Sequence, residues 1–410
     1  MRYWDAVYAF LVATAVAALL TPLAGRLARR VGAIAHPSDR GLARKPTPEL
    51  GGLAILAGVI IAAAIWMPAI IPLQRSPGEL RPSVVHTWPV LMGAVLIALI
   101  GAVDDAVDLK PLLKLLGQIA AAVAATAAGA VIKGLTVPFI GYLAFPDSGR
   151  ELTVVWLVAL MNIVNFSDGV DGLAAGVCAI DGAAFSVIAF RIQGGTSAAA
   201  VLAAVTAGAS IGFLFHNSYP AKIFMGDTGS NLLGYLLGVV AVIGSLKTNA
   251  AIALAVPLLV LAVPFMDTGF VVAKRLKYKR KPWDADNWHF HHRMANIGFS
   301  QRKTVAYLYA WTLMLAGVAV ALQFVPYKYH HAPGHYHLGW SIVMAAILVL
   351  AAAASVYLVY VLEIFKFKNL RATQLRRADP ETTEHEIVAS VQRDIETGEF
   401  DAIRQPEPQG

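Results

Sequence analysis

Cysteine and charged residues are both scarce in this chain of 410 residues. The single cysteine, Cys178, lies in an apolar run, which excludes an intrachain disulfide and indicates no redox role. Charged residues make up 14% of the chain and hydrophobic residues 57%, and the mean hydropathy is +0.61. We expect no cleavable signal, because the first apolar segment ends in Gly25-Arg26-Leu-Ala-Arg29-Arg30, not in a small-residue cleavage site. These features exclude a soluble domain with one apolar helix and indicate a polytopic membrane protein.

Long apolar runs predict an all-α bundle of about eleven membrane-spanning helices. The runs lie near residues 5–24, 51–71, 88–103, 112–132, 151–167, 172–191, 196–216, 229–246, 250–273, 302–324 and 339–362. We take residues 1–362 as the transmembrane domain and residues 363–410 as a C-terminal tail.

Lysine and arginine are distributed unevenly between the loops. They gather after the first, ninth and last predicted spans, and the intervening loops on the other side hold few. The positive-inside rule therefore places the N-terminus outside and the tail in the cytoplasm. The net charge of +7 has the same origin, so we expect a lipid bilayer and no nucleic acid as partner.

Four polar residues recur at every third position between the fifth and sixth predicted spans: Asn162, Asn165, Asp168 and Asp171. On a helix this spacing forms one slowly rotating polar stripe. Asn and Asp also cap helices, but capping explains only one or two of the four. Carboxylates at a membrane helix end are costly, so we interpret the stripe as functional.

Further acids fall on the same predicted face. Asp104 and Asp105 end the third span, and Asp227 precedes the eighth, while Lys114 follows Asp105 after a short turn. Taken singly, the first two fit a solvated helix end and the third an N-cap. Together they predict a site for Mg²⁺ and a diphosphate, because Mg²⁺ takes carboxylates and phosphate oxygens as ligands.

The last cytoplasmic loop contains a cluster of histidines, His289, His291 and His292, followed by Arg293. Such spacing also occurs in zinc sites, but these need a closed ligand set, and the one cysteine lies elsewhere. We therefore expect substrate or phosphate contacts from this loop.

Five motifs occur in a fixed order: Lys45-Pro-Thr-Pro-x-x-Gly-Gly52, Asp104-Asp105 with Lys114, Asn162-x-x-Asn-x-x-Asp-Gly-x-Asp-Gly-Leu-Ala, Asn217-Ser-Tyr-Pro-Ala-x-x-Phe-Met-Gly-Asp227-x-Gly-Ser and His289-x-His-His-Arg293. They resemble the polyprenyl-phosphate N-acetylhexosamine-1-phosphate transferases, glycosyltransferase family 4. The resemblance covers residues 5 to 362. It implies a bundle with a cytoplasmic active site and Mg²⁺-dependent transfer (Mn²⁺ is the alternative metal) of a phospho-sugar from a UDP-sugar to undecaprenyl phosphate.

The resemblance also implies residue roles. Asp227, with Asn165 and Asp104, matches the metal ligands, and Asp104 or Asp105 matches the group that orients or deprotonates the acceptor phosphate. Lys114 completes the catalytic group. The expected substrate-binding residues are Lys45, Thr47, Asn165, Asp168, Asp171, Asn217, Phe224, His289, His291, His292 and Arg293. Family members commonly carry Arg-Lys-x-His before the Pro-Thr-Pro element, whereas this chain reads Arg40-Gly41-Leu42-Ala43, which removes support for acceptor binding there beyond Arg40 and Lys45.

The histidine loop separates two branches of the resemblance. Asp286-x-x-His-x-His-His-Arg293 resembles the branch that uses UDP-N-acetylglucosamine to begin O-antigen (lipopolysaccharide), teichoic acid or related cell-wall glycans in the bacterial plasma membrane. Phospho-N-acetylmuramoyl-pentapeptide transferase of peptidoglycan synthesis is the alternative. An ion-coupled transporter is the alternative of another class, but the spans offer few mid-membrane charges. Whether the chain forms a homodimer is left open.

Overall fold

The computed structural model of the chain describes most of the N-terminal two thirds. The described residues are 4–36, 45–72, 84–137, 141–145, 147–193, 197–244, 261–277, 299–324 and 338–360, with positions 383, 386, 389 and 390. They belong to two compact units, which are Met1–Phe265 with Thr312–Val325, and Met266–Trp311 with Pro326–Gly410. The tail predicted at 363–410 lies almost wholly outside the described residues.

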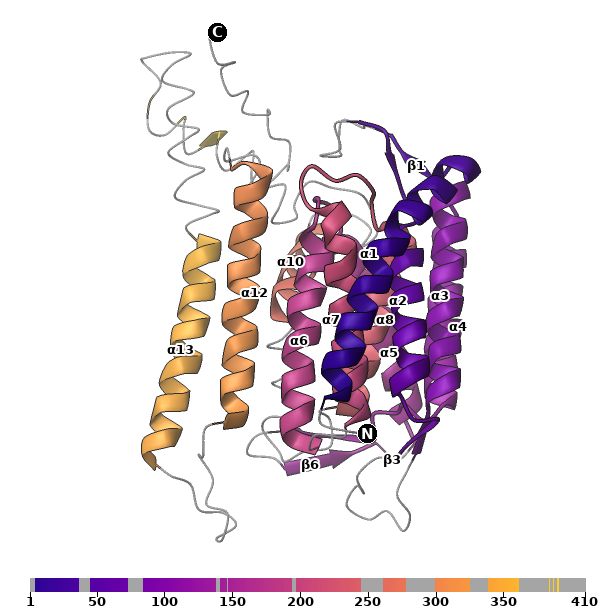
Figure 1. Cartoon of the computed structure of the whole chain (residues 1–410). Coiled ribbons are helices and arrows are strands. Elements are labelled where there is room, and N and C mark those ends of the chain that lie inside the picture. The colour runs from indigo at the N-terminus through magenta and orange to yellow at the C-terminus, as the bar shows by residue number, and fades with distance from the viewer. Residues whose placement is uncertain are drawn as a thin grey trace. The chain divides into compact units, whose positions relative to one another are not determined.

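Helices form nearly all of the regular structure (Figure 1). Their bounds are α1 Asp5–Val31, α2 Gly51–Trp66, α3 Thr87–Val107, α4 Pro111–Ala127, α5 Gly149–Ser167, α6 Leu173–Gln193, α7 Ala198–Asn217, α8 Gly226–Gly244, α10 Ala262–Lys277, α12 Gln301–Phe324 and α13 Leu338–Tyr360. The strands are β1 Ile34–Ala35, β2 Thr47–Pro48, β3 Ile70–Pro72, β4 Val84–His86, β5 Gly134–Val137 and β6 Gly141–Ala144.

Seven of the described helices are long and apolar enough to cross a membrane, and three shorter apolar helices accompany them. The chain is thus a multi-pass membrane protein, as its composition predicts. The span predicted at 250–273 coincides with α10 only from Ala262, since residues 245–260 lie outside the described part. The total of eleven spans and their orientation therefore stay predictions.

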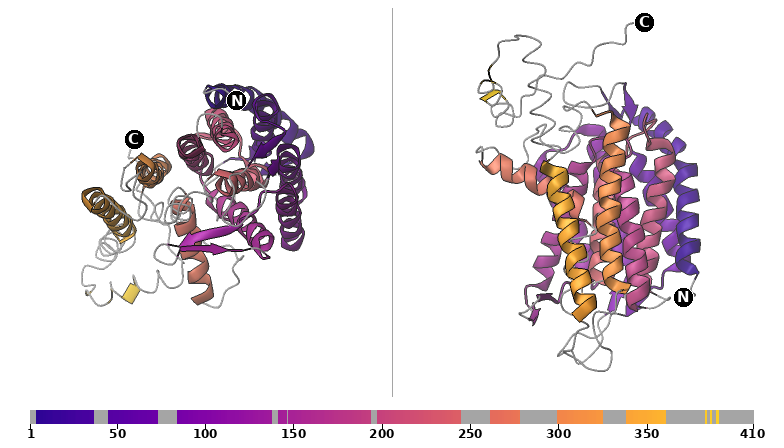
Figure 2. Two further views of the ribbon diagram at one scale, coloured as in Figure 1. Left: turned by 90° about the horizontal axis from the view of Figure 1, so that it is seen from below. Right: turned by 90° about the vertical axis from the view of Figure 1, so that its left-hand side faces the viewer.

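Helices α1 to α8 of the first unit stand side by side as one bundle, seen end-on in the indigo-to-magenta part of Figure 2. Its centre is α8, in which every residue from Thr228 to Gly244 is buried. Small residues bring neighbouring helices close together. A Cβ on Gly208 of α7 would lie 2.3 Å from the carbonyl oxygen of Phe10 in α1. Such close approach replaces hydrophobic burial as the main source of helix association in a bilayer.

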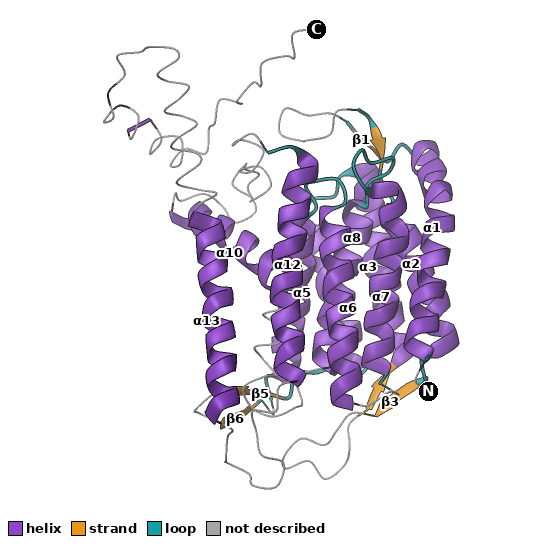
Figure 3. Cartoon of the chain, turned by 60° about the vertical axis from the view of Figure 1, so that its left-hand side comes forward, coloured by secondary structure: helices purple, strands orange, loops and turns teal. Residues whose placement is uncertain are grey.

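The two ends of this bundle carry different short hairpins (Figure 3). The β3–β4 and β5–β6 pairs lie at the end where the chain begins, and β1–β2 lies at the other (Figures 1 and 3). In the β5–β6 pair, Thr136 lies opposite Tyr142.

The first turn of α8 is fixed by direct backbone contacts at the β1–β2 end. A Cβ on Gly52 of α2 would lie 2.2 Å from the backbone nitrogen of Gly229, and one on Gly101 of α3 would lie 2.5 Å from that of Thr228. Gly51 and Gly52 also donate their N–H groups to the carbonyls of Phe224 and Met225, each at 3.0 Å. Glycine at these positions lets α2 and α3 lie directly against the start of α8.

In the second unit, the indole Nε1 of Trp311 donates to Ser355 Oγ at 2.9 Å, which joins α12 to α13.

Candidate active site at the end of the helix bundle

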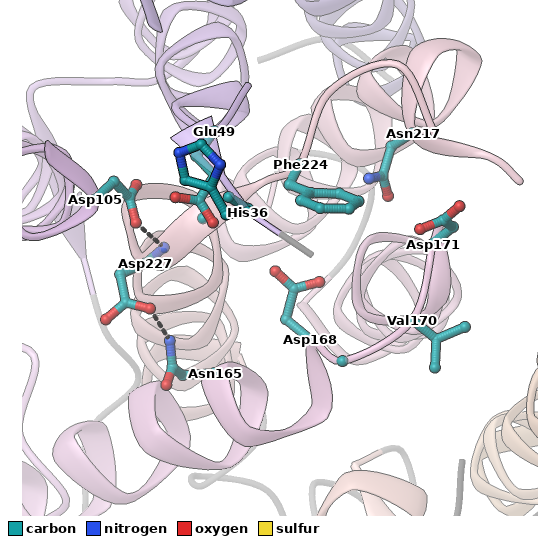
Figure 4. Close-up of a pocket in the computed structure, with 13 residues that line it drawn as sticks. His36, Glu49, Asp105, Asn165, Asp168, Val170, Asp171, Asn217, Phe224 and Asp227 are labelled. Atoms are coloured by element: carbon teal, nitrogen blue, oxygen red, sulfur yellow. Dashed lines mark hydrogen bonds between the residues drawn. The ribbon is translucent and has the colours of Figure 1, made fainter. Parts of the chain in front are cut away.

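A pocket of about 330 Å³ opens at the β1–β2 end of the first unit, among the loops that begin α2, α6 and α8 (Figure 4). It is lined by Ala35, His36, Glu49, Asp105, Asn165, Asp168, Gly169, Val170, Asp171, Asn217, Phe224, Gly226 and Asp227. Seven of the predicted site residues lie in this wall, although they come from three separate motifs. The sequence prediction that these motifs meet at one end of the bundle is thus supported by their placement.

A cluster of acids with one lysine lies at one side of the pocket. Lys114 Nζ is 2.6 Å from Asp104 Oδ2 and 3.3 Å from Asp227 Oδ2, so α4 is bound to both α3 and α8. Asp104 is buried and also accepts the N–H of Leu109 at 2.8 Å. One carboxylate oxygen from each of Asp104, Asp105 and Asp227 lies within 4.8 Å of the others. Ligands of this kind and spacing suit a hard divalent cation.

Asp105 has a different environment from its neighbour. Its Oδ1 accepts the backbone N–H of Asp227 at 2.7 Å, and its Oδ2 accepts the N–H and the hydroxyl of Thr228 at 3.1 Å and 2.6 Å. The side chain therefore caps the N-terminus of α8 from another helix. Gly226, with φ +68°, leaves room for it, since a Cβ there would lie 2.3 Å from Asp105 Oδ2.

Asn165 orients the carboxylate of Asp227. Its Nδ2 donates to Asp227 Oδ1 at 2.7 Å and to Ser230 Oγ at 2.9 Å (Figure 4). Lys114 occupies the other oxygen of the same carboxylate. Asp227 lies in the first turn of α8, which begins at Gly226. The apolar pattern of the sequence had predicted instead that Asp227 precedes this helix. The role of Asn165 as a metal ligand stays a prediction, and the contact that the structure gives is one that positions Asp227.

The break between α5 and α6 forms the opposite side of the pocket. Asp171 Oδ2 accepts the N–H of Ala221 at 2.9 Å, and Asn217 joins the N–H of Gly172 to the carbonyl of Ile223, both at 2.9 Å. These bonds hold the loop from α7 to α8 against the break. Asp168 and the ring of Phe224 face the space between the two sides (Figure 4).

Two further residues in the wall were not found from the sequence, namely His36 and Glu49 on either side of the β1–β2 hairpin. Glu49 occupies an unspecified position of the Pro-Thr-Pro-x-x-Gly-Gly motif, so its position in the motif was the only signal for it. Burial, reinforced by Asp105 and Asp227, raises the pKa of Glu49 to about 7. Burial and then Asp227 and Asp105 raise the pKa of Asp168 to about 8. The pocket is therefore strongly acidic, and a bound cation would reduce the repulsion between its carboxylates.

Four of the predicted residues that the structure describes do not line the pocket: Asp104 and Lys114, which pair with each other beside it, and Lys45 and Thr47. Lys45 is exposed, and Thr47 is buried with its hydroxyl bonded to the Lys45 carbonyl at 3.0 Å, so neither lines the pocket. His289, His291, His292 and Arg293 lie outside the described residues.

The chain is similar to known proteins over much of its length. Residues 87–245 match the profile described as glycosyl transferase family 4. A protein of Bacillus subtilis (strain 168), named probable undecaprenyl-phosphate N-acetylglucosaminyl 1-phosphate transferase, is 33% identical over 77% of this chain and 85% of its own length. The chain belongs to glycosyl transferase family 4. It is an enzyme of the transferase class, as the five motifs predict.

Two further relatives carry names that correspond to the N-acetylglucosamine branch and to the peptidoglycan branch. Decaprenyl-phosphate N-acetylglucosaminephosphotransferase of Mycolicibacterium smegmatis is 38% identical over 73% of this chain and 78% of the relative. Phospho-N-acetylmuramoyl-pentapeptide-transferase of Desulforudis audaxviator is 32% identical over 76% of this chain and 95% of the relative.

Proposed function

We propose that this chain transfers N-acetylglucosamine 1-phosphate from UDP-N-acetylglucosamine to undecaprenyl phosphate, which yields undecaprenyl-diphospho-N-acetylglucosamine and UMP. One observation carries the proposal: a single pocket has Asp105 and Asp227 on one side, with Lys114 paired to Asp227, and the ring of Phe224 on the other. A nucleotide sugar has the same division between a charged diphosphate and a flat base.

The base and the diphosphate of the donor are assigned to opposite sides of the pocket. Phe224 offers a ring face to uracil, since stacking on an aromatic side chain favours any base. Asp168, Asp171 and Asn217 lie around the same side as groups for the nucleoside. The diphosphate then lies toward Asp227 and Lys114.

The acids would hold Mg²⁺, with Mn²⁺ as an alternative. Asp227 and Asp104, with Asn165 beside them, supply the oxygen ligands that such a cation prefers. When bound, the cation neutralises phosphate charge and stabilises the leaving UMP. Lys114 lies half-buried between the two aspartates, and we assign its ammonium group to bind the phosphates.

Transfer itself needs little proton chemistry. An oxygen of the acceptor phosphate forms a bond to the sugar-bearing phosphorus, and the bond from that phosphorus to the bridging oxygen breaks as UMP takes the electron pair. The acceptor has a second pKa near 6, so it is mostly dianionic at about pH 7. We therefore assign electrostatic positioning to Asp104 and Asp105, and the three hydrogen bonds that Asp105 accepts from the start of α8 favour this role over proton abstraction.

We place the enzyme in the bacterial plasma membrane with its pocket facing the cytoplasm, where UDP-sugars are made. The distribution of lysine and arginine supports this orientation, and so does the position of the pocket at the bundle end opposite the N-terminus. The product would begin a cell-envelope polysaccharide such as O-antigen or a teichoic acid linkage.

Purified protein in detergent, supplied with undecaprenyl phosphate and Mg²⁺, should form lipid product from UDP-N-acetylglucosamine. UDP-N-acetylmuramoyl-pentapeptide serves as the competing donor. Product from the pentapeptide donor alone would move the chain to the peptidoglycan branch, and no product from either donor would overturn the proposal.

A further inference from the structure

One turn deeper in the bundle than the acids lies a layer of three amide side chains, Gln118, Asn162 and Asn231. Asn162 Nδ2 donates to Gln118 Oε1 at 2.8 Å, and Gln118 Nε2 donates to Asn231 Oδ1 at 2.8 Å. Asn231 Nδ2 then donates to the backbone carbonyl of Asp227 at 2.9 Å. The amide layer thus ends on Asp227 itself.

The amide layer repeats the arrangement of the site above it, helix by helix. On α4, Gln118 follows Lys114 by four residues, and on α8, Asn231 follows Asp227 by four. On α5, Asn162 precedes Asn165 by three. Since residues three or four apart share a helix face, each helix contributes one residue to each level.

This layer differs from several buried hydroxyl groups of the same bundle. Thr21, Thr206 and Ser210 bond to a carbonyl four residues earlier in their own helix, which satisfies the hydroxyl without joining helices. The amide layer instead joins α4, α5 and α8 through side chains alone. Gln118 and Asn231 are buried, so loss of one amide leaves its partner unsatisfied in a medium without competing water.

We propose that Gln118, Asn162 and Asn231 are positioning residues that hold Lys114, Asn165 and Asp227 in register and thereby set the affinity of the site for a divalent cation. The inference rests on the proposed function, because it gives these three helices the task of shaping a metal–diphosphate site. Amides suit this task, since they lock the relative rotation of three helices without adding charge beneath the acids.

The test measures Mn²⁺ binding by electron paramagnetic resonance on purified protein, alongside turnover. Gln118→Leu and Asn231→Leu should each weaken Mn²⁺ binding by about 10- to 100-fold, the usual effect of removing groups that orient metal ligands. They should lower kcat by a similar factor and change KM for the donor less. The matched control is Thr206→Val, which removes a buried hydrogen bond of α7 away from the site and should bind Mn²⁺ as wild type does.

The double variant Gln118→Leu/Asn231→Leu gives a second readout. Because it removes both ends of one hydrogen bond, its loss of Mn²⁺ affinity should be smaller than the product of the two single losses. Should Asn231→Leu fail to fold, Asn231→Ser removes the amide without adding bulk and carries the same comparison. Wild-type Mn²⁺ affinity in folded variants at both positions would overturn the inference. Wild-type protein that binds Mn²⁺ but transfers no sugar phosphate would overturn the proposed function alone.

Discussion

The carboxylate of Asp105 accepts the backbone N–H of Asp227 at 2.7 Å, so the end of one helix caps the start of another at the centre of the site. The same carboxylate binds both donors of Thr228. Adjacent acids in the sequence therefore have separate tasks: Asp104 pairs with Lys114, and Asp105 holds α8 in place.

Asp105→Ala should lower both stability and activity. It leaves the start of α8 without its cap, a loss that commonly costs about 0.5–2 kcal/mol. We expect a lower melting temperature in detergent and at least about 10-fold slower transfer, since Asp227 lies in the turn that the cap fixes. Asp227→Asn is the comparison, and it should lose activity with a smaller change in melting temperature. A stable Asp105→Ala protein would contradict the capping role.

Lys114→Met should have opposite effects on cation binding and on transfer. The ammonium group lies against Asp104 and Asp227, so its removal takes away a competitor for the cation. At about pH 8 and without donor, we expect tighter Mn²⁺ binding together with transfer at least about 10-fold slower, because the phosphates lose a positive partner. Weaker Mn²⁺ binding in this variant would show that Lys114 supports the cation site and does not compete for it.

Phe224→Ala should weaken donor binding. Stacking of a base on an aromatic ring contributes about 1–3 kcal/mol, which corresponds to a rise in KM for the UDP-sugar of roughly 5- to 150-fold. The matched control is Phe215→Ala, since that ring is 67% exposed on α7 and does not line the pocket. An unchanged KM in Phe224→Ala would remove the ring from the nucleoside subsite.

The stability of the cation-free protein should fall as pH rises. Burial and the neighbouring Asp227 raise the pKa of Asp168 to about 8, against about 3.9 in an unfolded chain. The folded state therefore binds this proton more tightly, and its stabilising effect is complete below about pH 4 and lost as pH rises through about 8. The melting temperature measured with EDTA should fall from about pH 6 to pH 9.

Asp168→Asn should flatten that slope, because the amide does not titrate. Glu151→Gln, in the first turn of α5 at the opposite end of that helix, should leave the slope as in wild type. A wild-type slope in Asp168→Asn would assign the pH dependence to other groups.

Much of this arrangement follows from the sequence, and its limits have a physical cause. Apolar runs and motif order predicted the helices and the gathering of Asp104, Asp168, Asn217 and Asp227 at one end of the bundle. Spacing along a helix also predicted that Asn162 and Asn165 share a stripe.

Contacts between helices could not be predicted in the same way. The rotation of α8 against α3 and α4 decides that Asp105 caps Asp227 and that Gln118 meets Asn231, 113 positions away. That rotation depends on glycines such as Gly52 and Gly101, whose partners only the packed bundle specifies. Glu49 and His36 were missed because a two-stranded hairpin, and no apolar pattern, brings them to the pocket.

The most direct measurement of the central claim is release of UMP by purified wild-type and Asp227→Asn protein supplied with UDP-N-acetylglucosamine, undecaprenyl phosphate and Mg²⁺. We predict turnover by the wild type that EDTA abolishes, and no turnover by a folded, membrane-inserted Asp227→Asn variant. Near-normal UMP release by Asp227→Asn, or wild-type release that is insensitive to EDTA, would contradict it.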